Sequence, residues 1–378
     1  MGPASTGDVA HDNGVEMKAV LLSGTLALVL SLLTTRLAIR QFTKWGYGQE
    51  IHEDLPSGHQ TKRGTPTMGG VAIVLSVVVG YFTAKLLTMT APTSSAYLLL
   101  LLFVGMAGVG FLDDYIKVVK QRSLGLRARA KMIGQAVIAV TFGVLALNPS
   151  MRNSDGVAPA SHQLSFLRDF GPHLAGIVVI VLIWLMVNGT SNATNLTDGL
   201  DGLLAGSATM VFGAYLIIGV WQNNHRCHTA GVADSICYNV HAPLDLAAIA
   251  AAIAGACFGF LWWNASPARI IMGDTGSLAI GAAMAGFAIM SRTEMLLIVL
   301  GGLYVAITMS VMLQVTWFKA TKRTSGVGKR LFRMAPLQHH FEILGWEQVT
   351  IVIRFWIITG LCVVAGLGIF YSEWVANL

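Results

Sequence analysis

Ten apolar stretches, separated by shorter polar segments, follow one another along the chain. They lie at residues 19–39, 69–89, 96–112, 132–147, 172–189, 203–221, 243–263, 277–291, 295–318 and 349–372. A transmembrane helix needs about 20 mostly apolar residues, and these stretches are close to that length. The alternation of apolar and polar residues that is typical of outer-membrane barrels does not occur. We therefore predict an all-α polytopic membrane protein with ten transmembrane helices.

Composition supports this fold class. Of the 378 residues, 54% are hydrophobic and 12% are charged, about half the charged fraction that is usual in soluble domains. The polar, glycine-rich residues 1–16 are predicted to be a disordered tail or a non-native remnant, which leaves residues 17–378 as one ten-helix domain. The first apolar stretch is too long for a signal peptide and lacks a cleavage site of small residues, so we expect it to be retained.

Charge orients the predicted bundle. An even number of helices places both termini on the same side of the membrane. Of the 25 Lys and Arg residues, 18 lie in or beside the loops that follow odd-numbered helices, and six lie on the other side. Since cytoplasmic loops carry the excess of basic residues, these loops are predicted to be cytoplasmic and both termini extracytoplasmic. The basic excess follows from this rule and indicates no nucleic acid partner.

The four cysteines indicate no metal site. Cys227 and Cys237 share one external loop, where they are either disulfide-bonded or free thiols. Cys257 and Cys362 lie in apolar stretches and are interpreted as packing residues, and no zinc-binding spacing is present.

Five polar motifs all fall in the loops that follow odd-numbered helices. They are TKRGTPTMGG (61–70), FLDDYIKVVK (111–120), NATNLTDGLDGL (192–203), NASPARIIMGDTGS (264–277) and FRMAPLQHHFE (332–342). Scattered polar residues would have fallen on both sides of the membrane. We therefore predict that the five motifs line one cytoplasmic cavity.

Two adjacent acids end the third predicted helix. Asp113 and Asp114 precede Lys117 by about one turn. Carboxylates are disfavoured at the negative end of a helix, and two that are partly out of water repel each other unless a cation is near. They are either a solvated helix end with a local ion pair, or a base and an indirect contact to a cation.

Further acids flank the sixth and eighth predicted helices. Asn195, Asp198 and Asp201 recur at every third position, which would place them near one face of a helix. Asp274 opens the eighth helix. Capping of a helix N-terminus is the alternative explanation in both places, although capping needs only one of the first three residues.

Together these residues predict a magnesium site for phosphoryl transfer. Mg²⁺ takes one or two carboxylates and substrate phosphates, and Lys62, Lys117, Arg122 and Lys131 are candidate phosphate partners. His339 and His340 are either structural or hydrogen-bond donors to such a site. No Walker-type loop is present, which argues against a nucleoside triphosphatase. The pattern favours transfer between a soluble and a lipid phosphate.

The motifs GTPTMGG, FLDDYIKVV, SNATNLTDGLDGL, FLWWNASPARIIMGDTGSLAIG and FRMAPLQHHFE resemble those of the phospho-N-acetylmuramoyl-pentapeptide translocase family. This family belongs to the superfamily of polyprenyl-phosphate sugar-phosphate transferases. The resemblance extends from about residue 17 to the end of the chain. It implies a homodimer in the bacterial cytoplasmic membrane, inhibition by nucleoside antibiotics and an active site that faces the cytoplasm. The implied reaction converts UDP-N-acetylmuramoyl-pentapeptide and undecaprenyl phosphate into lipid I and UMP, with Mg²⁺.

The resemblance also implies roles for individual residues. Asp274 is the expected Mg²⁺ ligand. Asp113 is expected to deprotonate or position the lipid phosphate, with Asp114 beside it. Lys117 and Lys131 are expected phosphate partners. The implied nucleotide and sugar-phosphate pocket is formed by Asn195, Asp198, Asp201 and Asn264 and lined by Lys62, Thr67 and Gln314.

The chain departs from the usual family motifs at several positions. Gln338 replaces the first histidine of a triplet, Ile271 replaces a phenylalanine that stacks on uracil, and Thr308 stands where the family usually has an acidic residue in helix nine. The departures admit two further hypotheses, an antibiotic-resistant copy of the enzyme or a related transferase. An ion-coupled transporter is a third, but its acids should lie at the bilayer midplane on broken helices.

Overall fold

The computed structural model describes residues 6–46, 64–120, 125–227 and 237–376. Ten of its helices are long and apolar enough to cross a membrane, which confirms the predicted all-α polytopic fold. In chain order the elements are α1 (Thr6–Trp45), α2 (Gly70–Leu87), α3 (Ser94–Val119), α4 (Ala128–Ala146), η2 (Pro149–Met151), β1 (Leu164–Ser165), β2 (Asp169–Phe170), α5 (Gly176–Thr197), α6 (Leu203–Asn224), α7 (Pro243–Asn264), α8 (Gly273–Met290), α9 (Leu296–Leu300), α10 (Gly302–Ser325), α11 (Leu337–Ile343) and α12 (Gln348–Ala376).

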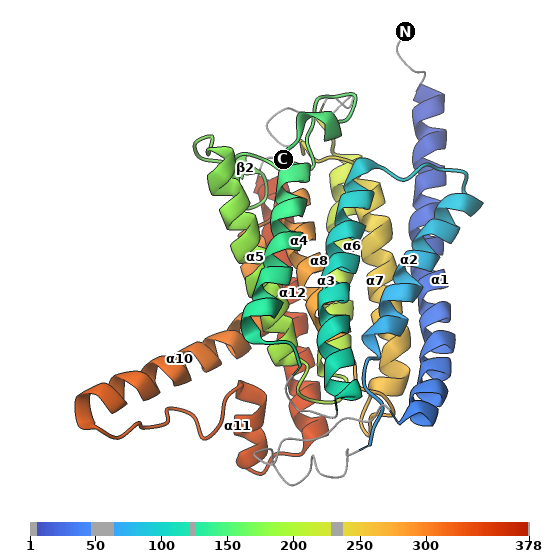
Figure 1. Cartoon of the computed structure of the whole chain (residues 1–378). Coiled ribbons are helices and arrows are strands. Elements are labelled where there is room, and N and C mark those ends of the chain that lie inside the picture. The colour runs from blue at the N-terminus through green and yellow to red at the C-terminus, as the bar shows by residue number, and fades with distance from the viewer. Residues whose placement is uncertain (1–5, 47–63, 121–124, 228–236, 377–378) are drawn as a thin grey trace.

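The helices form one bundle around α7 and α8, which are the most buried spans. α7 packs on α1 and α6, and α8 packs on α3 and α5 (Figure 1). Small residues allow the close contact between α1 and α7, because a Cβ atom on Gly255 would lie 2.2 Å from the carbonyl oxygen of Gly24. Such small-residue contacts are typical of membrane helix packing.

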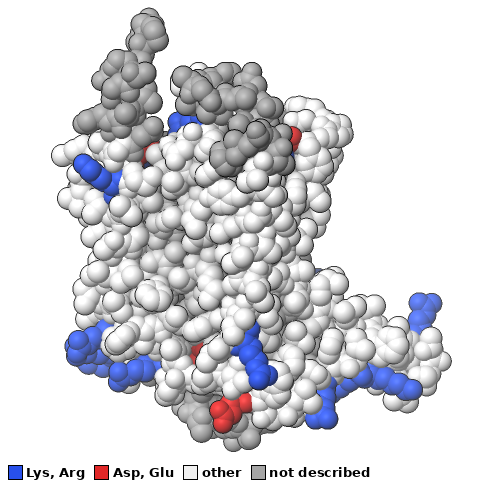
Figure 2. Space-filling view, turned by 180° about the vertical axis from the view of Figure 1, so that it is seen from behind, with Lys and Arg blue, Asp and Glu red and all other residues white. Residues whose placement is uncertain are grey.

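The two ends of the bundle differ. We call the end at which α8 begins the lower end, after its place in Figure 1, and the opposite end, where α1 begins and α12 ends, the upper end. Most Lys and Arg residues on the face shown in Figure 2 gather at the lower end. The upper end carries the β1–β2 hairpin and a disulfide between Cys227 and Cys237, which settles the pairing that the sequence left open.

Two sequence-based boundaries need correction. α1 begins at Thr6, so residues 6–16, part of the predicted disordered tail, are helical in the structure; their origin as a non-native remnant stays a prediction. The ninth predicted helix is broken at Gly301, whose φ of −93° and ψ of 19° end α9 before α10 begins. Cys362 packs against Gly302, where a Cβ atom would lie 2.7 Å from its Sγ. Beyond the break, α10 leans away from the bundle (Figure 1).

A buried ion pair ties α2 to α7 near the upper end. Lys85 Nζ lies 2.8 Å from Asp245 Oδ1, which also accepts a hydrogen bond from the Tyr81 hydroxyl at 2.7 Å. Asp245 Oδ2 accepts two more bonds, from the amide and the hydroxyl of Thr93. Every oxygen of this carboxylate is therefore satisfied without water.

We expect Asp245→Ala to destabilise the protein by about 3–5 kcal/mol, because it leaves the Lys85 ammonium buried and unpaired. Thermal unfolding of the purified protein in detergent measures this. The paired change Lys85→Met with Asp245→Leu should restore part of the loss, since it removes both charges. If the paired variant were less stable than Asp245→Ala, the buried unpaired charge of Lys85 would not be the cause of the loss.

Candidate active site

The acidic motifs converge at the lower end of the bundle. Oxygen atoms of Asp113, Asp114 and Asp274 all lie within 4.8 Å of one another. They come from the last part of α3 and the first turn of α8, segments about 160 residues apart in sequence. The start of α4 and the end of α5 complete the surroundings through Lys131 and Asn195. This arrangement confirms the prediction that these motifs share one side of the bundle.

Asp274 lies at the centre of the cluster. Its Oδ2 lies 3.1 Å from Lys117 Nζ and 2.6 Å from Lys131 Nζ. Its Oδ1 accepts a hydrogen bond of 2.7 Å from the side-chain amide of Asn195, which also donates to Ser277 Oγ at 2.9 Å. A carboxylate at a helix N-terminus beside two ammonium groups is favoured in its charged form.

Asp113 is held from two directions. Its Oδ2 lies 2.6 Å from Lys117 Nζ, one turn further along α3. Its Oδ1 accepts a hydrogen bond of 2.7 Å from the backbone amide of Leu126, in the segment that leads into α4. Gly125 permits this approach, because a Cβ atom there would lie 2.6 Å from the same oxygen. The contacts fix the carboxylate but leave it beside the lysines.

Asp114 has a different environment, since it caps α8. Its Oδ1 accepts from the backbone amide of Asp274 at 3.0 Å, and its Oδ2 accepts from the amide and the hydroxyl of Thr275 at 2.9 and 2.7 Å. The left-handed Gly273 (φ +76°) precedes these residues, and a Cβ atom there would lie 2.7 Å from Asp114 Oδ2. Asp114 thus satisfies free amide groups of the first turn and fixes the position of Asp274.

Close backbone contacts hold the start of α8 in place. A Cβ atom on Gly110 would lie 2.2 Å from the Asp274 carbonyl oxygen, so α3 can pack here only with glycine. The segment that leads into α2 pairs with the strand-like residues before α8. The amide of Ile271 donates to Pro66 at 2.8 Å, and the amide of Gly69 donates to Ile271 at 2.9 Å. Thr67 is thereby placed beside Ile271.

The segment 195–201 differs from its prediction. α5 ends at Thr197 and α6 begins at Leu203, so Asn195, Asp198 and Asp201 do not share one helical face. Asp198 is the C-cap residue of α5. Asp201 lies in the following turn, where its Oδ2 accepts a hydrogen bond from the amide of Ala268 at 3.1 Å. Gly202 then sets the start of α6, because it adopts a left-handed conformation with φ +78° directly before Leu203.

Two further side chains of this region have distinct surroundings. Burial, reinforced by the nearby carboxylates of Asp274 and Asp114, raises the pKa of the half-buried Asp198 well above its usual range. Asn264 joins two segments, since its Oδ1 accepts from Gly202 at 3.0 Å and its Nδ2 donates to Ile270 at 2.9 Å. A cation bound among these acids would offset the repulsion that Asp198 experiences.

α11 lies against the 196–201 turn. Gln338 is fully buried and donates from Nε2 to the carbonyl of Leu196 at 2.7 Å. A Cβ atom on Gly199 would lie 3.1 Å from His339 Nε2, and the Nδ1 of this ring lies 2.6 Å from Glu342. His340 instead accepts a hydrogen bond at Nδ1 from the amide of Arg333 at 3.1 Å. Only the first two residues therefore border the turn.

Some sequence-based candidates lie elsewhere. Gln314 is placed on α10, where its side chain accepts from the amides of Leu331 and Phe332 and donates to the Phe332 carbonyl. Lys62 and Arg122 lie outside the described residues. Conversely, no motif pointed to Leu126, and Ser277 belongs to the motif 264–277 but had no predicted role. The helix start MGDTGS does contain the signal for Thr275, because Thr and Ser are frequent near helix N-termini.

The residues of the cluster fit a Mg²⁺ ion. Mg²⁺ is bound by oxygen ligands and usually by one or two carboxylates, and three carboxylates lie within reach of one another here. The oxygens of Asp114 are already used to cap α8. Asp274, with Asp113 beside it, therefore offers the available ligand atoms.

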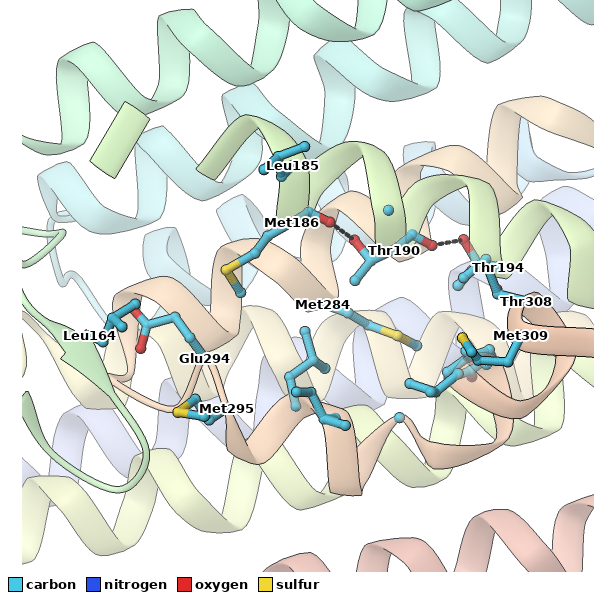
Figure 3. A pocket seen from close by; sticks show the side chains of 17 residues that line it. Leu164, Leu185, Met186, Thr190, Thr194, Met284, Glu294, Met295, Thr308 and Met309 are labelled. Carbon is cyan, nitrogen blue, oxygen red and sulfur yellow. Dashed lines mark hydrogen bonds between the residues drawn. The ribbon is translucent and has the colours of Figure 1, made fainter. Parts of the chain in front are cut away.

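An apolar groove leads away from the cluster along α5. The cavity, of about 400 Å³, lies between α5, α8, α9 and α10 and extends from Thr194 near the acids to Glu294 near the upper end (Figure 3). The hydroxyls of Thr190 and Thr194 donate to backbone carbonyls of α5 and so add little polarity. Part of Glu294 is exposed, but burial raises the pKa of its carboxyl group to about 8. Thr308 also lines the groove, so the departure from the family leaves this wall uncharged.

Comparisons with known proteins cover the chain almost completely. Residues 96–292 match the model described as glycosyl transferase family 4, and residues 62–74 match signature 1 of phospho-N-acetylmuramoyl-pentapeptide-transferase. Proteins that bear the latter name are similar over 96% of this chain. They include those of a Nocardioides species (63% identical, 100% of its length), Streptomyces avermitilis (55%, 99%) and Cutibacterium acnes (53%, 100%).

Proposed function

The chain belongs to the phospho-N-acetylmuramoyl-pentapeptide-transferase family, and we propose that the acidic cluster is the Mg²⁺-dependent centre at which it makes lipid I. The enzyme transfers phospho-N-acetylmuramoyl-pentapeptide from its UDP derivative to undecaprenyl phosphate and releases UMP. The observation that carries the proposal is the position of the cluster. Three carboxylates and two lysines lie at one end of a membrane-embedded bundle, where an apolar groove begins.

The proposed chemistry assigns a task to each side chain of the cluster. An oxygen of the lipid phosphate forms a bond to the sugar-linked phosphorus, and the bond from that phosphorus to the UMP oxygen breaks. Asp113 positions the lipid phosphate and accepts its proton if it arrives protonated. Lys117 and Lys131 bind phosphate oxygens. Asp274 would hold Mg²⁺, which when bound neutralises charge on the pyrophosphate.

Asp114 acts indirectly in this scheme. Its three hydrogen bonds to the first turn of α8 hold the Asp274 carboxylate toward the lysines. It is therefore a positioning residue. Asn264 and Asp201, which bond to the segment before α8, support the same turn from the other side.

We assign the apolar groove to the polyprenyl chain of the lipid substrate. Its lower end reaches Thr194, which is adjacent to Asn195, the hydrogen-bond partner of Asp274. A lipid chain in the groove would thus place its phosphate near the cluster. The neutral wall favours an alkyl occupant, because burial of apolar surface stabilises by about 25 cal/mol per Å².

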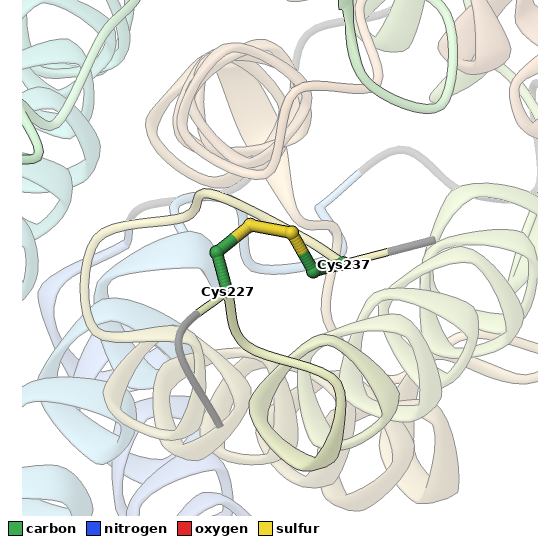
Figure 4. Close-up of a disulfide and its surroundings, with 2 residues drawn as sticks. All are labelled: Cys227 and Cys237. Carbon is green, nitrogen blue, oxygen red and sulfur yellow. A yellow bond between two sulfur atoms is a disulfide. The ribbon is translucent and has the colours of Figure 1, made fainter. Parts of the chain in front are cut away.

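The proposed orientation places the acidic cluster in the cytoplasm and both termini outside, in the bacterial cytoplasmic membrane. Two observations support it. Basic residues gather at the lower end with the cluster (Figure 2), as cytoplasmic segments do. The Cys227–Cys237 disulfide closes a loop at the upper end (Figure 4), and disulfides persist in oxidising compartments. A homodimer is also proposed, from family membership alone.

Parallel assays with two nucleotide sugars test the proposed function. Purified protein is supplied with undecaprenyl phosphate, Mg²⁺ and either UDP-N-acetylmuramoyl-pentapeptide or UDP-N-acetylglucosamine, and UMP release is followed. We expect release with the first donor and a lipid-linked product. Release with the second donor alone would indicate a related transferase. Failure with both would return the ion-coupled transporter to consideration.

The departures at Ile271 and Gln338 predict a difference in inhibitor binding. Stacking of a base on an aromatic ring is worth about 1–3 kcal/mol, and Ile271 offers apolar contact without a ring. The substrate is also held through its pyrophosphate, whereas a uridine-based inhibitor without a diphosphate depends more on uracil. We therefore expect Ile271→Phe to tighten the binding of such inhibitors by about 5–150-fold, while the KM of the UDP substrate changes little.

The measurement compares inhibition constants and KM for Ile271→Phe, alone and with Gln338→His. The second change tests whether the buried amide that bonds to Leu196 also affects inhibitors. Equal shifts in inhibition constant and KM, or no shift, would refute the hypothesis of reduced antibiotic sensitivity.

A further inference from the structure

The second half of α10 and the segment that follows it project from the bundle as a separate unit. We call residues 312–333 the basic arm. In Figure 1, α10 leans outward from the bundle, and in Figure 2 the same part extends to the side near the lower end. Since α10 is one of the ten apolar spans but is little buried, most of its surface is available to the surroundings of the bundle.

The basic arm is built as a hairpin. The segment after α10 turns at the left-handed Gly326 and runs back along the helix. The amide of Lys329 donates to Thr321 Oγ1 at 2.8 Å, and the amides of Leu331 and Phe332 donate to Gln314 Oε1 at 3.0 and 2.8 Å. Side chains from both limbs are therefore held on one structural unit.

The charge of the basic arm is wholly positive. The sequence from residue 296 to residue 341 contains no Asp or Glu. The arm carries six exposed cations, none of which forms an ion pair with another described residue: Lys319, Lys322, Arg323, Lys329, Arg330 and Arg333. In Figure 2, Lys and Arg side chains follow the lower edge of the arm and its tip, and the rest of its surface is uncharged.

Large apolar side chains accompany these cations. Trp317 is 47% exposed, Leu331 50% and Val327 68%. In water such residues would be costly to expose, but at a membrane surface they insert among the acyl chains while Lys and Arg extend to the headgroups. A basic segment beside a transmembrane helix attracts anionic lipid, and each Lys or Arg near the surface strengthens this attraction about fivefold.

We propose that the basic arm lies in the cytoplasmic headgroup layer and binds the anionic headgroups of membrane phospholipids. The proposal goes beyond the transferase reaction, although it rests on the orientation proposed above. Charge complementarity favours an anionic partner. The exposed apolar side chains continue from a membrane span, and they favour a lipid surface over a soluble acidic protein. The arm would also fix the outer wall of the apolar groove, since Val305 and Met309 of α10 line it.

Lipid association measured by electron paramagnetic resonance tests this surface. The full-length protein is placed in nanodiscs that contain trace spin-labelled phosphatidylglycerol or spin-labelled phosphatidylcholine, and the motionally restricted fraction of each label is compared. We expect a preference for phosphatidylglycerol that weakens as salt is added. The triple variant Lys319→Gln, Lys322→Gln, Arg323→Gln should reduce this preference more than about fivefold, which is the contribution of a single cation.

A matched variant distinguishes the effect of the arm from the effect of the total charge of the protein. Arg36, Arg40 and Lys44 are exposed near the lower end of α1, and their triple change to Gln removes the same charge elsewhere. Its preference for phosphatidylglycerol should fall less than that of the arm variant, because the arm gathers six exposed cations on one unit. Equal loss in both triple variants, or none in the arm variant, would overturn the proposal, as would capture of an acidic protein by the arm without lipid selectivity. UMP release in neutral nanodiscs, assayed in parallel, reports separately on the transferase reaction.

Discussion

Asp274→Asn is expected to lower the rate of UMP release by about 10²–10³-fold, the usual cost of removing one electrostatic stabiliser from an active site. The carboxylate contacts Lys117 and Lys131 through Oδ2 and Asn195 through Oδ1. Asparagine would present an amide NH₂ group or a neutral oxygen to these lysines, and an amide is a poor replacement for a hard anionic ligand of Mg²⁺.

The measurement is a Mg²⁺ titration of UMP release by the purified variant. Its fold should persist, because Asp114 bonds to the backbone amide of Asp274 and not to its side chain; thermal unfolding without Mg²⁺ checks this. Asp155→Asn, an exposed change at the upper end, is the control for a lost carboxylate. Near-normal turnover of Asp274→Asn at every Mg²⁺ concentration would remove this residue from the metal site.

Much of the fold could be predicted because the need of each transmembrane helix for a long apolar segment determines most of it. A membrane-spanning helix must be apolar along about 20 residues, and this requirement is readable in a single sequence. The distribution of Lys and Arg among the loops then assigned the motifs to one side of the membrane, which predicted that Asp113, Asp114 and Asp274 lie together. The break at Gly301 was missed because the apolar pattern continues through it. Hydropathy reflects the free energy of transfer of side chains into lipid, and it contains no information on where a helix axis breaks or bends.

The parts of the site that depend on contacts between distant segments could not be predicted from the sequence. The role of Asp114 depends on hydrogen bonds to residues about 160 positions away, and the two bonds of Asn264 depend on how the 202 and 270 segments meet. Spacing alone suggested a shared helical face for Asn195, Asp198 and Asp201, but α5 ends at Thr197 and α6 begins only after Gly202. The individual roles in nucleotide binding came from family resemblance and stay predictions.

The neighbouring acids Asp113 and Asp114 are expected to respond differently to the same change. Asp113→Asn should lower kcat by about 10²–10⁴-fold, the usual contribution of a positioned acid–base group, and leave the affinity for UMP nearly unchanged. The reason is that Asp113 is proposed to act on the lipid phosphate. Its structural bond to the Leu126 amide uses Oδ1, which asparagine can reproduce, so stability should be retained.

Asp114→Asn provides the contrast that makes this assignment testable. Its carboxylate receives three hydrogen bonds from the first turn of α8, and an amide NH₂ group would face one or more of these donors. Loss of such a cap costs about 0.5–2 kcal/mol, so the thermal midpoint should fall together with the rate. UMP affinity, kcat and thermal unfolding are measured for both variants. If Asp113→Asn weakened UMP binding as much as it slowed turnover, Asp113 would belong to the nucleotide pocket and its role toward the lipid phosphate would be wrong.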